Sequence, residues 1–293
     1  MSNNWKRVLF ALWAIPAALG IVYYGGLPLA LLVALIAALG AHELVSIARR
    51  QGIEPLWRHA LVLSATIPLA VWMTYGGMVI RLGGLDWSAL MPSVWFALAG
   101  TVIWILAATL FNRAPDQHPL GVASVTLMVP LYCAVLPSFL LGIRYVTGPE
   151  RSWPATWAVF FPLAVTWIGD SVAMGVGKSV GGPKLAPIVS PGKTRSGSVA
   201  GFVGGVAAAV VFNRLALIPS GFTVTDVQAV IFGGVLSVAA QIGDLAESLF
   251  KREAGVKDSS GLIPGHGGIL DRFDALYFVV PISAMLYRAF GLI

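Results

Sequence analysis

Acidic and basic side chains recur at helical spacing near the C-terminal end of the chain, where an apolar stretch ends. Asp244, Glu247 and Lys251 are three and four residues apart, so they share one face of a helix. Asp271 and Asp274 follow about one turn apart, where another apolar stretch begins. An ionisable residue at membrane depth is costly and marks a functional site by default. The alternative is that Asp244 lies at the membrane interface and pairs with Lys251 or its basic neighbour.

Carboxylates from two separate elements can share a hard cation. Mg²⁺ prefers oxygen ligands and commonly takes one or two carboxylates together with substrate phosphates. We therefore expect Mg²⁺ at Asp244 and Asp271, and a second cation is left open. His266 stands among Gly265, Gly267 and Gly268, which would keep the backbone close to another group.

A second polar segment, residues 170–197, has the composition of a polyphosphate site. Its glycines let the backbone approach an oxyanion, and its lysines add positive charge. Gly197 and Ser198 would open a helix, whose N-terminus favours anions. It is not a P-loop, because Pro187 stands where that motif needs a glycine before Gly192-Lys193-Thr194. The alternative is a loop that is basic only for topology.

The elements that must position these residues are apolar helices. Of the 293 residues, 57% are hydrophobic and 11% charged, against about 25% charged in soluble domains. These values exclude a soluble globular domain, a disordered chain and a coiled coil. We expect an all-α integral membrane protein with about nine transmembrane helices. They are predicted at residues 7–24, 27–48, 60–81, 90–111, 119–142, 154–176, 198–218, 226–249 and 274–291. No small-residue cleavage site follows the first, so it is expected to be retained.

The distribution of basic residues predicts the orientation. With these spans, 14 of the 19 lysines and arginines fall on the side of the N-terminus, and five fall on the other: Arg81, Arg144, Arg151, Arg214 and Arg288. Basic loops stay in the cytoplasm. We therefore expect a multi-pass protein of the inner (cytoplasmic) membrane with a cytoplasmic N-terminus. We then expect the net charge of +6 to attract anionic lipid headgroups and anionic substrates rather than nucleic acid. The single cysteine, Cys133, excludes an intrachain disulfide and a cysteine-based zinc site.

The residues that could take part in catalysis are concentrated in the second half of the chain. Eight of the 13 acidic residues lie from Asp170 onward, together with two long loops at about residues 177–197 and 250–273. Loops of this length are commonly functional. We therefore divide the chain into residues 1–150, with about five plain spans, and residues 151–293, a catalytic transmembrane region.

Residues 248–274 resemble the signature of the phosphatidate cytidylyltransferase (CDP-diacylglycerol synthase) family. That signature reads S-x-hydrophobe-K-R, four residues, K-D, then P, H-G-G and D-R-hydrophobe-D. Its fixed positions are all present: Ser248, Lys251, Arg252, Lys257, Asp258, Pro264, His266, Gly267, Gly268, Asp271, Arg272 and Asp274. Upstream, Asp170-Ser171 and the segment from Lys184 to Thr194 are also similar to the family pattern. One departure is Ser196, where a Glu or Gln is common.

The resemblance implies an enzyme that joins CTP to phosphatidic acid, giving CDP-diacylglycerol and pyrophosphate for phospholipid synthesis. It implies catalytic roles for Asp244, Asp271, Lys251, Arg252, Lys257, Asp258, His266 and Arg272. It implies substrate contacts at Asp170, Lys184, Ser190, Lys193, Thr194, Ser248, Gly267, Gly268 and Asp274. Asp258 and Asp274 have the alternative of capping helices.

The expected partners are CTP, phosphatidic acid and membrane lipids, and a homodimer is left open. One alternative is a cytidylyltransferase or CTP-dependent kinase acting on another membrane lipid. A transporter is a weaker alternative, because transporters commonly carry broken helices in both halves of a repeat. Here the polar residues occupy one half of the chain.

Overall fold

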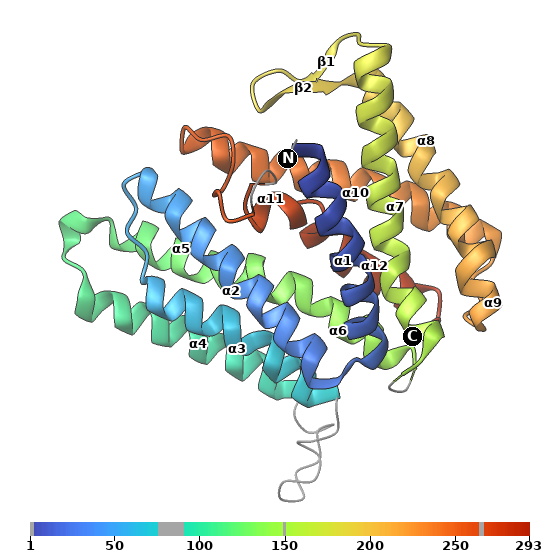
Figure 1. Ribbon diagram of the computed structural model, residues 1–293. Coiled ribbons are helices and arrows are strands. Elements are labelled where there is room, and N and C mark those ends of the chain that lie inside the picture. Colours follow the sequence, from blue (N-terminus) through green and yellow to red (C-terminus); the bar gives the residue numbers. More distant parts are fainter. Residues whose placement is uncertain (1–2, 76–90, 149–150, 264–266) are drawn as a thin grey trace, which may run out of the picture.

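The computed structural model describes residues 3–75, 91–148, 151–263 and 267–293, and most of them are helical (Figure 1). The N-terminal part forms α1 (Asn3–Tyr24), α2 (Gly26–Arg50), α3 (Trp57–Tyr75), α4 (Met91–Asn112), the 3₁₀ helix η2 (Pro115–Gln117), α5 (Pro119–Pro130), η3 (Leu131–Val135) and α6 (Leu136–Val146). The C-terminal part forms α7 (Trp153–Ser179), β1 (Lys184–Ala186), β2 (Ser190–Thr194), α8 (Arg195–Phe212), η4 (Asn213–Leu217), α9 (Ile218–Ser220), α10 (Asp226–Glu253), α11 (Leu270–Phe273) and α12 (Leu276–Ala289).

Two of the long helical stretches contain a wide π-helical turn. In both, a proline follows closely: Pro137 after the start of η3 and Pro219 after the start of η4. A proline has no N–H to donate, and its ring clashes with the carbonyl four residues earlier. The wider turn relieves that clash, so α5, η3 and α6 form one continuous helical stretch, and so do α8, η4 and α9.

The expected all-α membrane protein is confirmed at that level. Within the described residues, the apolar stretches predicted as spans are helical, apart from Asp274, Ala275, Phe290 and Gly291 at the ends of the last one. Among the described residues, five helical stretches are long and apolar enough to cross a membrane: Gly26–Arg50, Pro119–Tyr145, Trp153–Ser179, Arg195–Ser220 and Asp226–Glu253. The count of nine spans stays a prediction, and α12, with 14 residues, is shorter than a spanning helix. Residues 76–81 of the third predicted span lie outside the described residues.

Strands interrupt the helical pattern at the first long loop. β1 and β2 form an antiparallel hairpin in which Lys184 pairs with Thr194. Gly181 and Gly182 turn the chain out of α7 with φ of +67° and +104°, values that favour glycine. The Thr194 hydroxyl accepts the Gly197 N–H at 3.1 Å and so caps α8, which begins slightly earlier than the sequence suggests. Ser196, the departure from the family pattern, donates a hydrogen bond to the Gly181 carbonyl and so closes this segment.

Glycines allow α7, α8 and α10 to pack closely, and this packing brings their polar ends together (Figure 1). A Cβ atom on Gly201 of α8 would lie 3.1 Å from the Gly169 carbonyl oxygen of α7. A Cβ atom on Gly233 of α10 would lie 2.6 Å from Val206 Cα of α8. Larger side chains at these positions would separate the helices.

The N-terminal and C-terminal parts share one apolar core. Leu29 and Val33 of α2 belong to the same buried cluster as Phe161 of α7 and Val279 of α12. The division at residue 150 thus separates segments that pack against one another. That the catalytic residues lie in residues 151–293 stays a prediction.

Candidate active site

A buried ion-pair cluster joins the end of α10 to α11. Lys251 Nζ lies 2.5 Å from Glu247 Oε2 and 2.6 Å from Asp271 Oδ1. All three side chains are less than a tenth exposed. Glu247 and Lys251 are one turn apart on α10, as their spacing predicted, and Asp271 reaches them from another element. Lys251 and Asp271, each predicted to be catalytic, therefore lie in direct contact.

The Asp271 carboxylate also organises the loop that precedes it. Its Oδ2 accepts the N–H groups of Ser259 and Gly268, each at 2.8 Å. Burial alone would raise the pKa of Asp271, but hydrogen bonds from Lys251 and from the Gly268 and Ser259 N–H groups hold it below its ordinary value. A Cβ atom on Gly267 would lie 2.7 Å from Asp271 Oδ2. The glycine-rich backbone is thus close to this carboxylate.

A second ion pair joins the hairpin to α10. Lys193 of β2 places Nζ 2.7 Å from Asp244 Oδ2, and both side chains are about one third exposed or less. The Ser248 hydroxyl lies 3.3 Å from Asp244 Oδ1. Asp170 of α7 faces the same place, since the charges of Asp244 and Lys193 both act on its carboxylate. The partner of Asp244 is thus Lys193, and not Lys251 or Arg252 as the alternative interpretation held.

Arg252 connects the two long loops. Its Nε donates to the Val189 carbonyl at 3.2 Å, and its NH1 donates to the Val256 carbonyl at 2.9 Å. The predicted substrate residues of the hairpin differ in their exposure to solvent. Thr194 is buried as a helix cap, whereas Lys184 is exposed and Ser190 half-buried.

Several predicted site residues are solvent-exposed. Lys257, Asp258 and Arg272 are exposed and make no side-chain hydrogen bond or ion pair within the described part of the chain. Asp258 lies in a loop and caps no described helix. Asp274 Oδ1 accepts the Ala275 N–H at 2.7 Å, where α12 is about to begin. His266 lies outside the described residues.

Sequence reasoning missed Glu43, which lies on α2 and is 3% exposed. Its Oε1 accepts the Ser260 hydroxyl and the Ile269 N–H, and its Oε2 accepts the Ser259 hydroxyl and the Leu270 N–H. The signal was present, because Glu43 is an ionisable residue inside an otherwise apolar stretch.

The carboxylates of this site fit a hard cation whose remaining coordination positions would be filled by substrate phosphates. A carboxylate has about four lone-pair positions. Within the described residues, Asp271 Oδ1 receives only Lys251, each Asp244 oxygen makes one contact, and the buried Glu247 Oε1 has no hydrogen-bond partner. These open oxygens suit Mg²⁺. Among the described residues no group of three or more His, Cys, Asp or Glu is arranged to hold a metal ion by itself.

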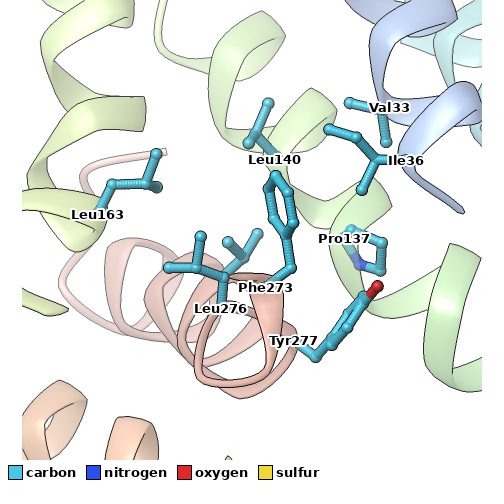
Figure 2. A pocket seen from close by; sticks show the side chains of 9 residues that line it. Val33, Ile36, Pro137, Leu140, Leu163, Phe273, Leu276 and Tyr277 are labelled. Carbon is cyan, nitrogen blue, oxygen red and sulfur yellow. The ribbon is translucent and has the colours of Figure 1, made fainter. Parts of the chain in front are cut away.

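An apolar cavity begins where the polar site ends. Figure 2 shows Phe273 of α11 and Leu276 of α12 facing Leu140 of α6, with Leu163 of α7 to one side. The cavity measures about 50 Å³, and its remaining lining is also mainly hydrophobic: Val33, Ile36, Pro137, Tyr277 and Val280. Because Phe273 stands between Asp271 and Asp274, this cavity adjoins the carboxylates along the chain.

Comparison with known proteins gives a consistent result over most of the chain. The profile of the cytidylyltransferase family matches residues 5–290. Proteins named phosphatidate cytidylyltransferase are similar to this chain. That of Brucella abortus is 33% identical over 248 residues, which cover 75% of this chain and 87% of the relative. That of Synechocystis sp. is 30% identical over 298 residues, covering 94% of each chain. That of Haemophilus influenzae is 30% identical over 293 residues, covering 96% of this chain and 98% of the relative.

Proposed function

The chain belongs to the cytidylyltransferase family, and on that premise we propose that it transfers a cytidylyl group from CTP to phosphatidic acid. The products are CDP-diacylglycerol and pyrophosphate. The names of the relatives from Brucella abortus, Synechocystis sp. and Haemophilus influenzae support this substrate pair. The observation that carries the proposal is one cluster of lysines and carboxylates, Lys193–Asp244 and Lys251–Asp271, at the end of the membrane-length helix α10 and beside an apolar cavity.

The reaction requires alignment more than proton transfer. A phosphate monoester has its second pKa near about 6, so the lipid phosphate is largely a dianion at neutral pH. Its oxygen attacks the α-phosphorus of CTP, a new P–O bond forms, and the bond to the β-phosphate breaks as pyrophosphate leaves. The nucleophile needs no general base. The protein must instead hold two anions in line and offset their repulsion.

Lys193 is suited to the CTP phosphates. It extends from the hairpin, and Asp244 holds its ammonium in place at 2.7 Å. Lys184, Ser190 and Thr194 lie on the same hairpin, and Asp170 lies on the neighbouring α7. Arg252, Lys257 and Arg272 are exposed cations that would neutralise phosphate charge. Roles for Asp258, His266, Gly267 and Gly268 are carried over from the family signature.

We assign the cation to the open oxygens of Asp244 and Asp271. Mg²⁺ bound there would offset the negative charge that develops on the leaving pyrophosphate. Lys251 touches Asp271 and Glu247, so it sets the position of the Asp271 carboxylate. Asp274 lies within range of the Asp244, Glu247 and Lys251 charges and would complete the acidic wall of the site.

The apolar cavity suits a short part of an acyl chain of the lipid substrate. Its lining residues from α2, α6, α7 and α12 offer no charged group, and a hydrocarbon chain gains free energy there by leaving water. A lipid held this way would present its phosphate toward Asp271 and Asp274. The site would face the cytoplasm, where CTP is found, and the excess of basic residues on the side of the N-terminus supports this orientation in the inner membrane.

The function is tested with purified protein in detergent, CTP, Mg²⁺ and phosphatidic acid. Formation of CDP-diacylglycerol and pyrophosphate in equal amounts, only when both substrates are present, is the expected result. Formation of CDP and a newly phosphorylated lipid would instead identify a CTP-dependent kinase.

A further inference from the structure

Glu43 is a buried carboxylate of the N-terminal part of the chain, and its side-chain hydrogen bonds within the described residues all come from segment 259–270. Its four hydrogen-bond donors lie 216 to 227 residues away in sequence. Burying a carboxylate is costly unless hydrogen bonds satisfy it. Here both oxygens are satisfied, at 2.9 and 2.8 Å for Oε2 and 2.6 and 3.0 Å for Oε1. The arrangement is specific, because each oxygen receives one hydroxyl and one backbone N–H.

The contacts of Glu43 lead directly to Asp271. Ile269 and Leu270, whose N–H groups it accepts, immediately precede Asp271 at the start of α11. Ser259 provides a second route, because its N–H donates to Asp271 Oδ2 and its hydroxyl lies 2.9 Å from both Glu43 Oε2 and Asp271 Oδ2. The backbone on both sides of the Asp271 carboxylate is therefore attached to one side chain of α2.

Gly268 makes this close approach feasible. A Cβ atom at that position would lie 2.5 Å from Glu43 Oε2 and 2.1 Å from the Ser259 hydroxyl. Any larger residue would force Glu43 away from the loop. The glycine in the family signature thus has a local physical reason, which is the space occupied by a carboxylate from α2.

We propose that Glu43 is a positioning residue of the active site, which fixes Asp271 through Ser259 and the first N–H groups of α11. The proposal rests on the function given above. It assigns the N-terminal helices a part in the chemistry: α2 supplies the group that holds the catalytic loop in its reactive arrangement, without touching the substrates.

Glu43→Gln is the sharpest test because it preserves the size of the side chain. Whichever oxygen becomes an NH₂ group, it then faces a backbone N–H, which cannot rotate away and cannot accept a hydrogen bond. We expect kcat to fall by about 10-fold or more, as for loss of hydrogen bonds to a charged group, while the KM for CTP changes by less than about twofold. Glu54→Gln is the matched control and should leave kcat unchanged, since the Glu54 side chain is exposed and forms an ion pair with Arg49 on the surface.

A second readout does not depend on the reaction. Amide hydrogen exchange of Ile269 and Leu270 should accelerate by about 10-fold or more in Glu43→Gln, while the middle of α10 keeps its protection. If wild-type protein makes no CDP-lipid but this local exchange still changes, the proposed function fails and the loop-holding contact stands. Unchanged exchange at both residues together with normal kcat would overturn the role of Glu43.

Ser260→Ala keeps the proposal testable if Glu43→Gln fails to fold. It removes one donor, at 2.6 Å from Glu43 Oε1, and leaves the carboxylate in place. A fall in kcat of about threefold or more with local faster exchange at Ile269 is expected. Wild-type kcat and exchange in Ser260→Ala would contradict the proposal. In addition, Glu43→Gln should cost little further activity in an Asp271→Asn background, because both changes act on one carboxylate. Independent, multiplicative losses would instead indicate a merely structural role.

Discussion

Lys251 Nζ lies 2.6 Å from Asp271 Oδ1, although the two residues are 20 positions apart in the sequence. The same ammonium lies 2.5 Å from Glu247 Oε2. One buried cation therefore serves two carboxylates from α10 and α11. Because a buried charge without a partner is costly, this contact fixes the relative position of the two elements that carry the acidic groups of the site.

Lys251→Met should destabilise the protein and abolish turnover. It leaves Glu247 and Asp271 without their counter-charge, and breaking a buried pair costs about 3–5 kcal/mol. Thermal unfolding in detergent should show a clearly lower Tm. Adding Glu247→Gln should restore part of the Tm but not the activity. A Tm equal to that of wild type would show that the pair contributes nothing.

Lys193→Gln should weaken CTP binding. The lysine extends toward the site from the hairpin, and a charge-assisted contact to phosphate is worth about 1.5–3 kcal/mol, so the KM for CTP should rise by about 10-fold or more. The KM for phosphatidic acid should change little. Arg50→Gln is the matched control, because it removes an exposed charge at the end of α2, outside the segment 170–197. Equal effects of the two substitutions would indicate only a general electrostatic contribution.

The chemistry of the C-terminal segment was largely predictable from local spacing. The spacing of Asp244, Glu247 and Lys251 predicted a shared helix face, because the period of the α-helix requires it. The structure places Glu247 and Lys251 in contact on that face. The glycines around residue 267 predicted a close approach of the backbone. What lies against them, namely Asp271 and Glu43, depends on how distant segments pack.

Other features could not be read from the sequence because they arise from tertiary contacts. Glu43 lacked any local pattern beyond its place in an apolar stretch, and its four partners come from the other end of the chain. The alternative interpretation paired Asp244 with a basic residue of its own helix, but the hairpin brings Lys193 to it. Hydropathy predicted that the apolar stretches are helices. It did not predict where each helix begins and ends, because prolines and loops set those bounds.

Leu140→Trp should discriminate against long acyl chains. Leu140 points into the apolar cavity (Figure 2), and the larger ring would occupy space that a lipid chain needs. We expect a higher KM for phosphatidic acid with long chains and little change with very short ones. Phe111→Trp is a control, since Phe111 is 84% exposed and remote in sequence from the cavity. The same KM shift for both chain lengths would contradict binding of an acyl chain in this cavity.

Cysteine labelling should test the orientation of α10. In a Cys133→Ser background, Glu253→Cys at the end of α10 should react with an impermeant thiol reagent only in inside-out vesicles. Thr223→Cys, just before the start of α10, should react only from outside intact cells. Both positions are exposed. The reverse pattern would place the site outside and remove its access to CTP.

The position of an isotopic label tests the central claim most directly. With CTP labelled at the α-phosphate, Mg²⁺ and phosphatidic acid, wild-type protein should move the label into a CDP-lipid. With CTP labelled at the γ-phosphate, the label should appear in pyrophosphate. Asp244→Asn and Asp271→Asn should each reduce α-label transfer by about 100-fold or more, and the double variant should be little worse because both serve one cation. Transfer of γ-label to the lipid, or near-normal α-label transfer by either variant at saturating Mg²⁺, would contradict the account.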